Sequence, residues 1–217
     1  MFTDRREAGQ RLAVAVAALR LERPLVLALP RGGVPVAFEV AQHLGAPLDI
    51  VLVRKLAAPG QPELGIGAMV DGEPPQVVLN AAVMADLRPP ESHIAAETAR
   101  QLGELERRRQ LYRGDVPAQS VADRTIVLVD DGVATGSSAQ AALRGLRQAG
   151  ARRLVLAVPV GAADAMARLE ALADEVVCLV IPVDFQAVGQ WFMHFAQTGD
   201  DEVIQLLATA RQRVDPT

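Results

Sequence analysis

The sequence predicts a three-layer α/β/α fold with a mainly parallel sheet, built as one domain over residues 1–217. Short apolar runs alternate along the chain with amphipathic stretches of helical period, which is the order that builds βα units. The runs lack regular alternation with polar residues, as expected of strands covered on both faces. In such open sheets, ligands bind at the carboxyl ends of the strands.

The first half of the predicted core is a helix, a strand, a helix and a second strand. We expect these elements over residues 4–20, 25–29, 34–44 and 48–53. Pro30-Arg31-Gly32-Gly33 follows the first strand, and Arg54-Lys55 follows the second. Adjacent glycines expose backbone N–H groups to an anion, and the two cations fall at the same sheet edge.

A long insertion, residues 57–113, then interrupts the alternation of strands and helices. Asp71-Gly72 lies between two short apolar runs and predicts a hairpin, and a highly charged helix with a mostly solvated surface is expected over 91–112. Insertions of this length often form flexible lids over active sites. We therefore expect a lid, with Glu63, Tyr112 and Arg113 as contributors to the site.

The alternation resumes after a linker over 114–122. Strands are expected over 125–129, 154–158 and 176–181, and helices over 136–149, 162–173 and 200–213. Residues 182–200 separate the last strand from the last helix and are expected to form a small hood.

Composition narrows the function classes. With 22 Lys and Arg against 26 Asp and Glu, the net charge is −4, so no overall basic field favours nucleic acid. The single cysteine, Cys178, excludes an intramolecular disulfide and a cysteine zinc site. No signal peptide or membrane-spanning stretch is evident, so we expect a cytoplasmic protein without a membrane partner.

The most informative stretch is 127–138, where an apolar run ends in Asp130 and Asp131. A turn rich in glycine and hydroxyls follows, and then a helical pattern. Carboxylates beside a nest of backbone N–H groups suit a sugar phosphate. On this stretch alone, a helix cap or a casual cation site stays open as an alternative. A P-loop is a weaker alternative, because Ser137 stands where the motif requires a lysine after Gly136.

Together these motifs resemble those of the type I phosphoribosyltransferases. Residues 127–138 are similar to the signature for 5-phosphoribosyl 1-pyrophosphate, and 30–33 resemble the pyrophosphate loop. Arg54-Lys55 resembles the basic pair of adenine and xanthine phosphoribosyltransferases. The Arg-Lys…Pro-Glu-Leu-Gly-Ile-Gly-Ala pattern and the Leu-Tyr-Arg-Gly stretch are most similar to bacterial stand-alone phosphoribosyltransferase-domain proteins of unassigned base. The resemblance covers about residues 2–213.

The resemblance implies an enzyme of nucleotide salvage, a Mg²⁺-dependent transferase. It would move the 5-phosphoribosyl group from 5-phosphoribosyl 1-pyrophosphate to a nucleobase-like acceptor and release pyrophosphate. The implied catalytic residues are Asp130, Asp131, Arg54 and Lys55, with the two aspartates also holding Mg²⁺ through water. The implied substrate-binding residues are Arg31, Gly32, Gly33, Val133, Ala134, Thr135, Gly136, Ser137, Ser138, Phe185 and Trp191.

The pyrophosphate loop of the family suggests a non-proline cis peptide at 30–33, and a homodimer is compatible with the resemblance. Two alternatives stay open: a regulatory protein that binds 5-phosphoribosyl 1-pyrophosphate without catalysis, and transfer to a non-base acceptor.

Two observations bear on the acceptor. Ala134 stands where hypoxanthine-guanine phosphoribosyltransferases carry an acid, so that class is disfavoured. Four of the seven aromatic residues fall within 185–195, and a planar base needs a flat apolar surface for stacking. We expect Phe185 or Trp191 to provide it, and Phe192 and Phe195 to pack the hood.

Overall fold

A five-stranded parallel sheet forms the centre of the protein, in a computed structural model that describes residues 1–214. Its strand order is β2-β1-β6-β7-β8, and every neighbouring pair is parallel. The strands are β1 (Leu25–Ala28), β2 (Leu48–Ile50), β6 (Thr125–Val129), β7 (Arg153–Val160) and β8 (Glu175–Val180). The predicted α/β fold with a mainly parallel sheet is confirmed.

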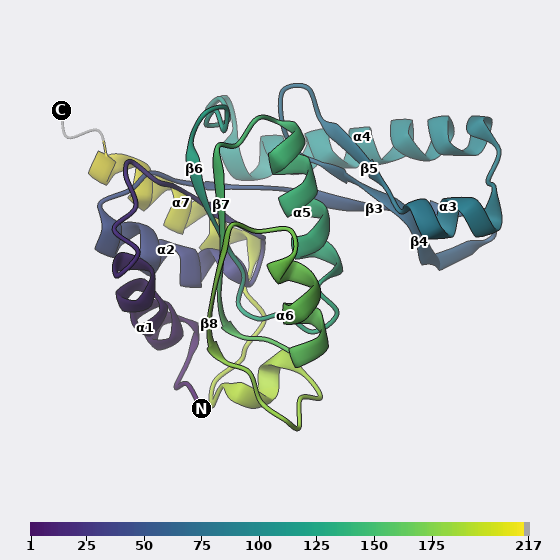
Figure 1. The fold of residues 1–217 in the computed structure, drawn as a ribbon. Coiled ribbons are helices and arrows are strands. Elements are labelled where there is room, and N and C mark those ends of the chain that lie inside the picture. The colour runs from purple at the N-terminus through teal and green to yellow at the C-terminus, as the bar shows by residue number, and fades with distance from the viewer. Residues whose placement is uncertain (215–217) are drawn as a thin grey trace.

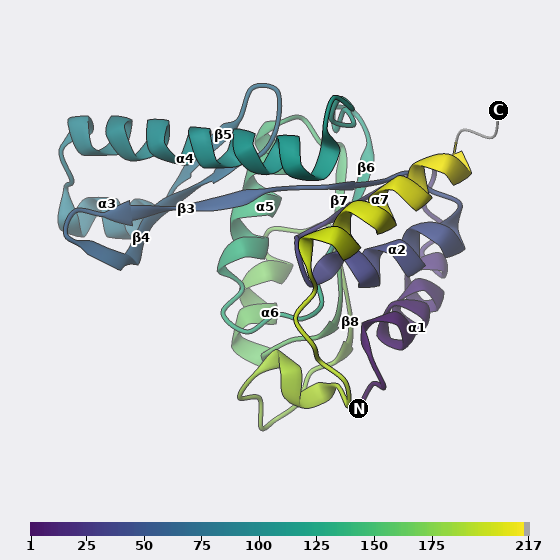
Figure 2. The same ribbon diagram turned by 180° about the vertical axis from the view of Figure 1, so that it is seen from behind.

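Helices cover both faces of this sheet (Figures 1 and 2). One layer holds α1 (Arg5–Ala17), α2 (Gly33–Leu44) and α7 (Asp200–Val214), and the other holds α5 (Ser137–Gln148) and α6 (Ala163–Glu170). Side chains of β6 alternate between the two layers: Val127 and Val129 pack on the first side, and Ile126 and Leu128 on the second. This double burial is the reason the strands are apolar throughout.

The insertion is an ordered arm that extends away from the core (Figure 1). It contains an antiparallel sheet of β3 (Val53–Ala58), β4 (Gln61–Val70) and β5 (Gln76–Leu79), followed by α3 (Ala81–Leu87) and α4 (Glu91–Arg113). The predicted hairpin around Asp71-Gly72 is present as β4 and β5. Helix α3 was not predicted, and its seven residues include no buried side chain.

The arm begins earlier than predicted. The strand expected over 48–53 stops at Ile50, and the chain leaves the parallel sheet through Val51 and Leu52. Val53 then pairs with Val70 of β4. An antiparallel partner inside the arm therefore takes up residues that the apolar run alone assigned to the core.

The long charged helix α4 is also less solvated than predicted. One buried stripe of α4 is formed by residues spaced four or seven apart, Glu97, Gln101, Leu105 and Tyr112. Ala57 N–H of β3 donates to Glu97 Oε1 at 3.2 Å and joins this stripe to β3, while Gln101 Nε2 donates to the same oxygen at 3.0 Å within α4. The stripe thus packs α4 against the arm and the core.

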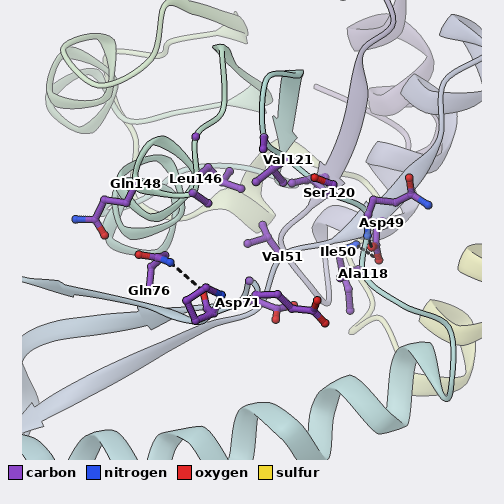
Figure 3. Close-up of a pocket in the computed structure, with 18 of the residues that line it drawn as sticks. Asp49, Ile50, Val51, Asp71, Gln76, Ala118, Ser120, Val121, Leu146 and Gln148 are labelled. Atoms are coloured by element: carbon purple, nitrogen blue, oxygen red, sulfur yellow. Dashed lines mark hydrogen bonds between the residues drawn. The ribbon is translucent and has the colours of Figure 1, made fainter.

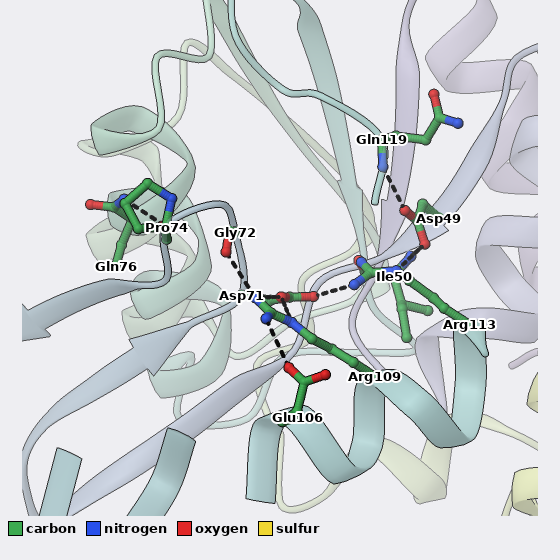
Figure 4. Close-up of polar contacts among 10 residues, drawn as sticks. All are labelled: Asp49, Ile50, Asp71, Gly72, Pro74, Gln76, Glu106, Arg109, Arg113 and Gln119. Atoms are coloured by element: carbon green, nitrogen blue, oxygen red, sulfur yellow. Dashed lines mark hydrogen bonds and ion pairs between the residues drawn. The ribbon is translucent and has the colours of Figure 1, made fainter. Parts of the chain in front are cut away.

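A buried ion cluster anchors the arm to the core (Figure 4). Arg113 donates from Nε to Asp49 of β2 at 2.9 Å, from one terminal nitrogen to Asp71 at 2.7 Å, and from the other to the Ile50 carbonyl at 2.6 Å. Arg109 donates to the second oxygen of Asp71 at 2.6 Å. Because the side chains of Arg113, Asp49 and Asp71 are each at most 6% exposed, every charge depends on its partners.

Replacing Arg113 tests this anchor. Arg113→Met leaves Asp49 and Asp71 buried without their cation, so we expect a loss of about 3–5 kcal/mol in the free energy of unfolding. Arg147→Met is the matched control, because Arg147 pairs with Asp174 on the surface, where both side chains are 42% exposed; its loss should stay below about 1 kcal/mol. Urea unfolding measures both, and equal losses would show that the cluster is no anchor.

Candidate functional site

The loop after β6 connects the central strand to α5 and is fixed at several points. Val133 pairs with the end of β7, donating to the Val160 carbonyl at 2.9 Å and accepting from Ala162 N–H at 2.9 Å. Gly136 adopts a φ of +77°, which few residues other than glycine tolerate, and places Ser137 as the first residue of α5. The loop therefore bends sharply into the N-terminus of a helix.

That helix N-terminus fits an anion. The first turn of α5 has N–H groups without intrahelical acceptors, and Gly136 offers no side-chain cap. The Thr135 and Ser137 hydroxyls lie 3.2 Å apart beside these N–H groups. Donors of both kinds, together with the positive end of the helix dipole, form a cradle for a phosphate group.

Two aspartates stand at the start of the same loop. Asp130 Oδ1 accepts from the backbone N–H of Asp131 at 2.9 Å. Burial of its carboxyl group, and then the negative charge of Asp131, raise the pKa of Asp130 well above its ordinary value. Carboxyl oxygens accept hydrogen bonds from sugar hydroxyls, and the two side chains are adjacent in sequence. The pair can therefore hold two adjacent hydroxyls.

The turn after β1 packs directly against this acidic pair. A Cβ added at Gly32 would overlap the carboxyl group of Asp131, and one added at Gly33 would lie 2.8 Å from the Val129 carbonyl oxygen. The peptide bond between Pro30 and Arg31 is cis, as the resemblance suggested for this loop. Glycine is thus required here for close approach, and the structure brings residues 31–33 together with Asp130 and Asp131.

The two cations after β2 diverge. They lie on β3, where successive side chains point to opposite faces. Arg54 Nε donates to Gln101 of α4 at 3.0 Å, whereas Lys55 Nζ lies 3.5 Å from Glu63 Oε2. Arg54 and Lys55 therefore have different hydrogen-bond partners, although both residues line the same cavity.

A cavity of about 510 Å³ between β3, β4, β5 and α5 has Arg54, Lys55, Ser137 and Ser138 in its wall. Lys55 therefore shares a cavity with the phosphate cradle. Glu63, which we expected to contribute to the site, also lines this cavity.

Arg5 is a site residue that sequence reasoning missed. Its Nε donates to Asp131 Oδ2 at 2.8 Å, another nitrogen donates to the Ala196 carbonyl at 2.7 Å, and its guanidinium carbon lies 3.8 Å from the centre of the Phe195 ring. Arg5 thereby connects the first helix, the acidic pair and the hood. No local pattern indicated this role, because its partners are 126 and 191 residues away in sequence.

Arg108 of α4 was also missed. A hollow of about 80 Å³ at the strand ends has Pro30, Asp130, Ser138 and Arg108 in its wall. Here a signal existed: Arg108 lies three residues after Leu105 and four before Tyr112, on the stripe of α4 that faces inward. A cation on such a stripe points to a polar interior or a ligand.

The other expected contributors from the insertion have separate roles. Tyr112 donates its hydroxyl to Asp200 Oδ1 at 2.6 Å, and burial followed by this hydrogen bond raises the pKa of Tyr112 to about 12. Arg31 pairs with the same Asp200 at 3.5 Å, so Tyr112 lies beside the pyrophosphate loop. Arg113 belongs to the buried ion cluster instead. Its expected contribution to the site is corrected to an anchoring one.

The hood lies beside the N-terminus of the chain (Figure 2). Phe2 N–H donates to the Trp191 carbonyl at 2.8 Å, and the Phe2 ring centre is 5.4 Å from that of Phe192, which is 4.9 Å from that of Phe195. The predicted packing role of Phe192 and Phe195 fits these contacts. Trp191 Nε1 is buried and finds no hydrogen-bond acceptor within residues 1–214.

Of the two expected stacking residues, Phe185 packs partly against the core. Its role and that of Trp191 as a base platform stay predictions.

A second large cavity lies away from these loops, beside the ion cluster (Figure 3). It measures about 480 Å³ and is bordered by Asp49, Asp71, Ser120 and the last turn of α5. The two carboxylates are already paired with Arg113. Since Asp49 and Asp71 are neutralised within the protein, these two carboxylates offer less to a charged ligand than the strand ends do.

The donor set at the strand ends fits one kind of metal ion. Residues 1–214 hold no cluster of three or more acidic, histidine or cysteine side chains suited to a metal. Mg²⁺ is typically held by one or two carboxylates together with substrate phosphates and water. Asp130 and Asp131 beside a phosphate cradle match that pattern. The described residues do not offer a site in which protein side chains alone would surround a metal ion.

Comparison with known proteins agrees with this geometry. The family described as phosphoribosyl transferase domain matches residues 6–193. Two relatives, from strains CDC 1551 and H37Rv of Mycobacterium tuberculosis, are 47% identical over 212 residues and carry the provisional name phosphoribosyl transferase. The match covers 98% of this chain and 47% of each relative, so the chain spans about half the length of the curated relatives it matches.

A solved structure extends the likeness to three dimensions. The crystal structure of TT1426 from Thermus thermophilus is 48% identical, with a TM-score of 0.86 over 96% of this chain and 98% of that one. None of the helices within 1–214 combines the length and apolar content that a membrane span requires. The chain belongs to the phosphoribosyl transferase domain family, a family of transferase enzymes.

Proposed function

We propose that this protein transfers the 5-phosphoribosyl group of 5-phosphoribosyl 1-pyrophosphate to a nucleobase-like acceptor and releases pyrophosphate, in nucleotide salvage. The observation that carries the proposal is the contact between two loops at one sheet edge. Asp131 packs on Gly32, so the acidic pair and the phosphate cradle adjoin the glycine turn beside Arg31. A ribose with a phosphate at C5 and a pyrophosphate at C1 presents matching groups.

The proposed reaction breaks the bond between C1 of the ribose and a pyrophosphate oxygen and forms one from C1 to a nitrogen of the acceptor. Positive charge develops on the sugar and negative charge on the leaving oxygens. Asp131 would stabilise the positive charge on the sugar, and Arg31 the negative charge on the leaving oxygens, because fixed charges act strongly where water is excluded. Mg²⁺, when bound to the substrate phosphates beside Asp130 and Asp131, would neutralise part of the leaving charge.

Arg5 would position Asp131 during this reaction. It already holds Oδ2 of that carboxylate at 2.8 Å and stacks on Phe195, so the carboxylate has a fixed direction before substrate arrives. A preorganised charge needs no reorientation as the sugar charge develops. The hood, which Arg5 also contacts, would carry the acceptor, with Phe185 or Trp191 as the stacking surface.

Binding and turnover test the proposal in sequence. Calorimetric titration with 5-phosphoribosyl 1-pyrophosphate should show binding that tightens when Mg²⁺ is present. A panel of purine and pyrimidine bases should then contain at least one that releases pyrophosphate. Absence of binding with and without Mg²⁺ would overturn the proposal. Binding without release by any base would instead assign the protein a regulatory role or a non-base acceptor.

Replacing the charged acid beside the sugar tests the chemistry. Asp131→Asn keeps the shape of the side chain but removes its charge, so we expect kcat to fall on the order of 100-fold. The control is Asp86→Asn on α3, an exposed aspartate in the arm, which should leave kcat within about 2-fold. Thermal unfolding of both variants verifies the fold. Unchanged turnover in Asp131→Asn would show that this acid is structural.

A further inference from the structure

The arm places two guanidinium groups, those of Arg107 and Arg108, next to the pyrophosphate loop. A pocket of about 190 Å³ is lined by Pro30, Arg31, Arg107, Arg108, Leu111, Tyr112 and Asp200. Pro30 and Arg108 also line the hollow that contains Asp130 and Ser138. Arg108 therefore lies at the boundary between the sugar side of the site and the pyrophosphate loop.

The position of Arg108 on its helix explains this placement. Leu105 and Tyr112, on either side of it along the inward stripe, are 0% and 4% exposed, whereas the Arg108 side chain is 32% exposed. Its only charged partner within residues 1–214 is Glu104, which accepts from Arg108 Nε at 2.9 Å. On this face of α4, buried packing residues therefore give way to one solvent-accessible cation, Arg108, where the helix passes the strand ends.

The carboxylates near this pocket are too few for its cations. Glu104 also accepts two hydrogen bonds from Arg107, and Asp200 is shared between Arg31 and the Tyr112 hydroxyl. The three guanidinium groups that line the pocket, Arg31, Arg107 and Arg108, therefore share two carboxylates, which leaves a surplus of one positive charge.

A surplus of fixed positive charge beside a phosphate cradle is suited to a polyanion. Guanidinium groups bind phosphate oxygens through paired, charge-assisted hydrogen bonds. We infer that Arg108 is a pyrophosphate-binding residue, so that the pyrophosphate site is shared between Arg31 of the core and α4 of the arm. This inference rests on the proposed function, and it makes the arm part of the substrate site.

Binding of separate substrate fragments tests the inference. Inorganic pyrophosphate should bind the wild-type protein in calorimetric titration, and Arg108→Gln should weaken that binding on the order of 10-fold or more, because a charged hydrogen bond is lost. Ribose 5-phosphate, which would use the cradle alone, should bind both proteins within about 2-fold. Arg108→Lys keeps the positive charge but loses the paired N–H donors of the guanidinium group. Its affinity for pyrophosphate should lie between those of the wild type and Arg108→Gln.

A variant on the same helix gives the control. Arg100→Gln removes one charge from α4 at an exposed position that pairs with Glu97 and lines neither hollow, so pyrophosphate binding should change by less than about 2-fold. Equal pyrophosphate binding by wild type, Arg108→Gln and Arg108→Lys would overturn the inference. Two other results would also overturn it: no pyrophosphate binding by the wild type, or an Arg108→Gln variant that weakens the binding of ribose 5-phosphate as much as that of pyrophosphate. Failure of the wild type to bind 5-phosphoribosyl 1-pyrophosphate would instead overturn the proposed function.

Discussion

The buried pairing of Arg113 with Asp49 and Asp71 fixes the relation between the arm and the core. Asp49 lies on the edge strand β2 and Asp71 in the turn after β4, and Arg113 is the last residue of α4. Desolvated charges are costly when separated, so the three segments have one favourable arrangement. Because Arg108 lies only five residues before Arg113, this arrangement also sets where α4 passes the ends of the parallel strands.

The site thus combines two kinds of support. The parallel sheet holds the acidic pair, the cradle and the glycine turn on rigid strand ends, where Gly32 and Asp131 touch. The arm brings cations from α4 on one side and Lys55 on the other. A substrate with negative charge at both ends of its sugar would contact both parts, so substrate binding and arm position are expected to be linked. Arg5 adds a third connection, to the hood.

Sequence patterns predicted the features that depend on neighbouring residues. The strand over 125–129 and the turn into α5 were found because double burial and helix initiation leave local signatures. The end of β2 was misplaced since the pairing of Val53 with Val70 is a tertiary choice. Arg113 was expected at the site because the sequence shows that it lies in an insertion. The sequence does not show that Arg113 pairs with Asp49 and Asp71 in the folded protein.

The cations were the hardest part of the site to predict. Arg54-Lys55 reads as a pair in sequence, yet the alternation of a strand sends the two side chains to different neighbours. Arg5 and Arg108 act across long separations and belong to helices whose charges usually face solvent. For Arg108 alone, the spacing from Leu105 and Tyr112 indicated that the side chain lies on the inward face of α4. The many charged residues of α4 obscured this apolar spacing.

A crystal structure with 5-phosphoribosyl 1-pyrophosphate and Mg²⁺ tests the central claim most directly. We expect the 5-phosphate at the N-terminus of α5, the ribose hydroxyls on Asp130 and Asp131, and the pyrophosphate between Arg31 and Arg108. Ligand bound instead in the cavity beside Asp49 and Asp71, or bound at the strand ends with its pyrophosphate away from α4, would contradict it.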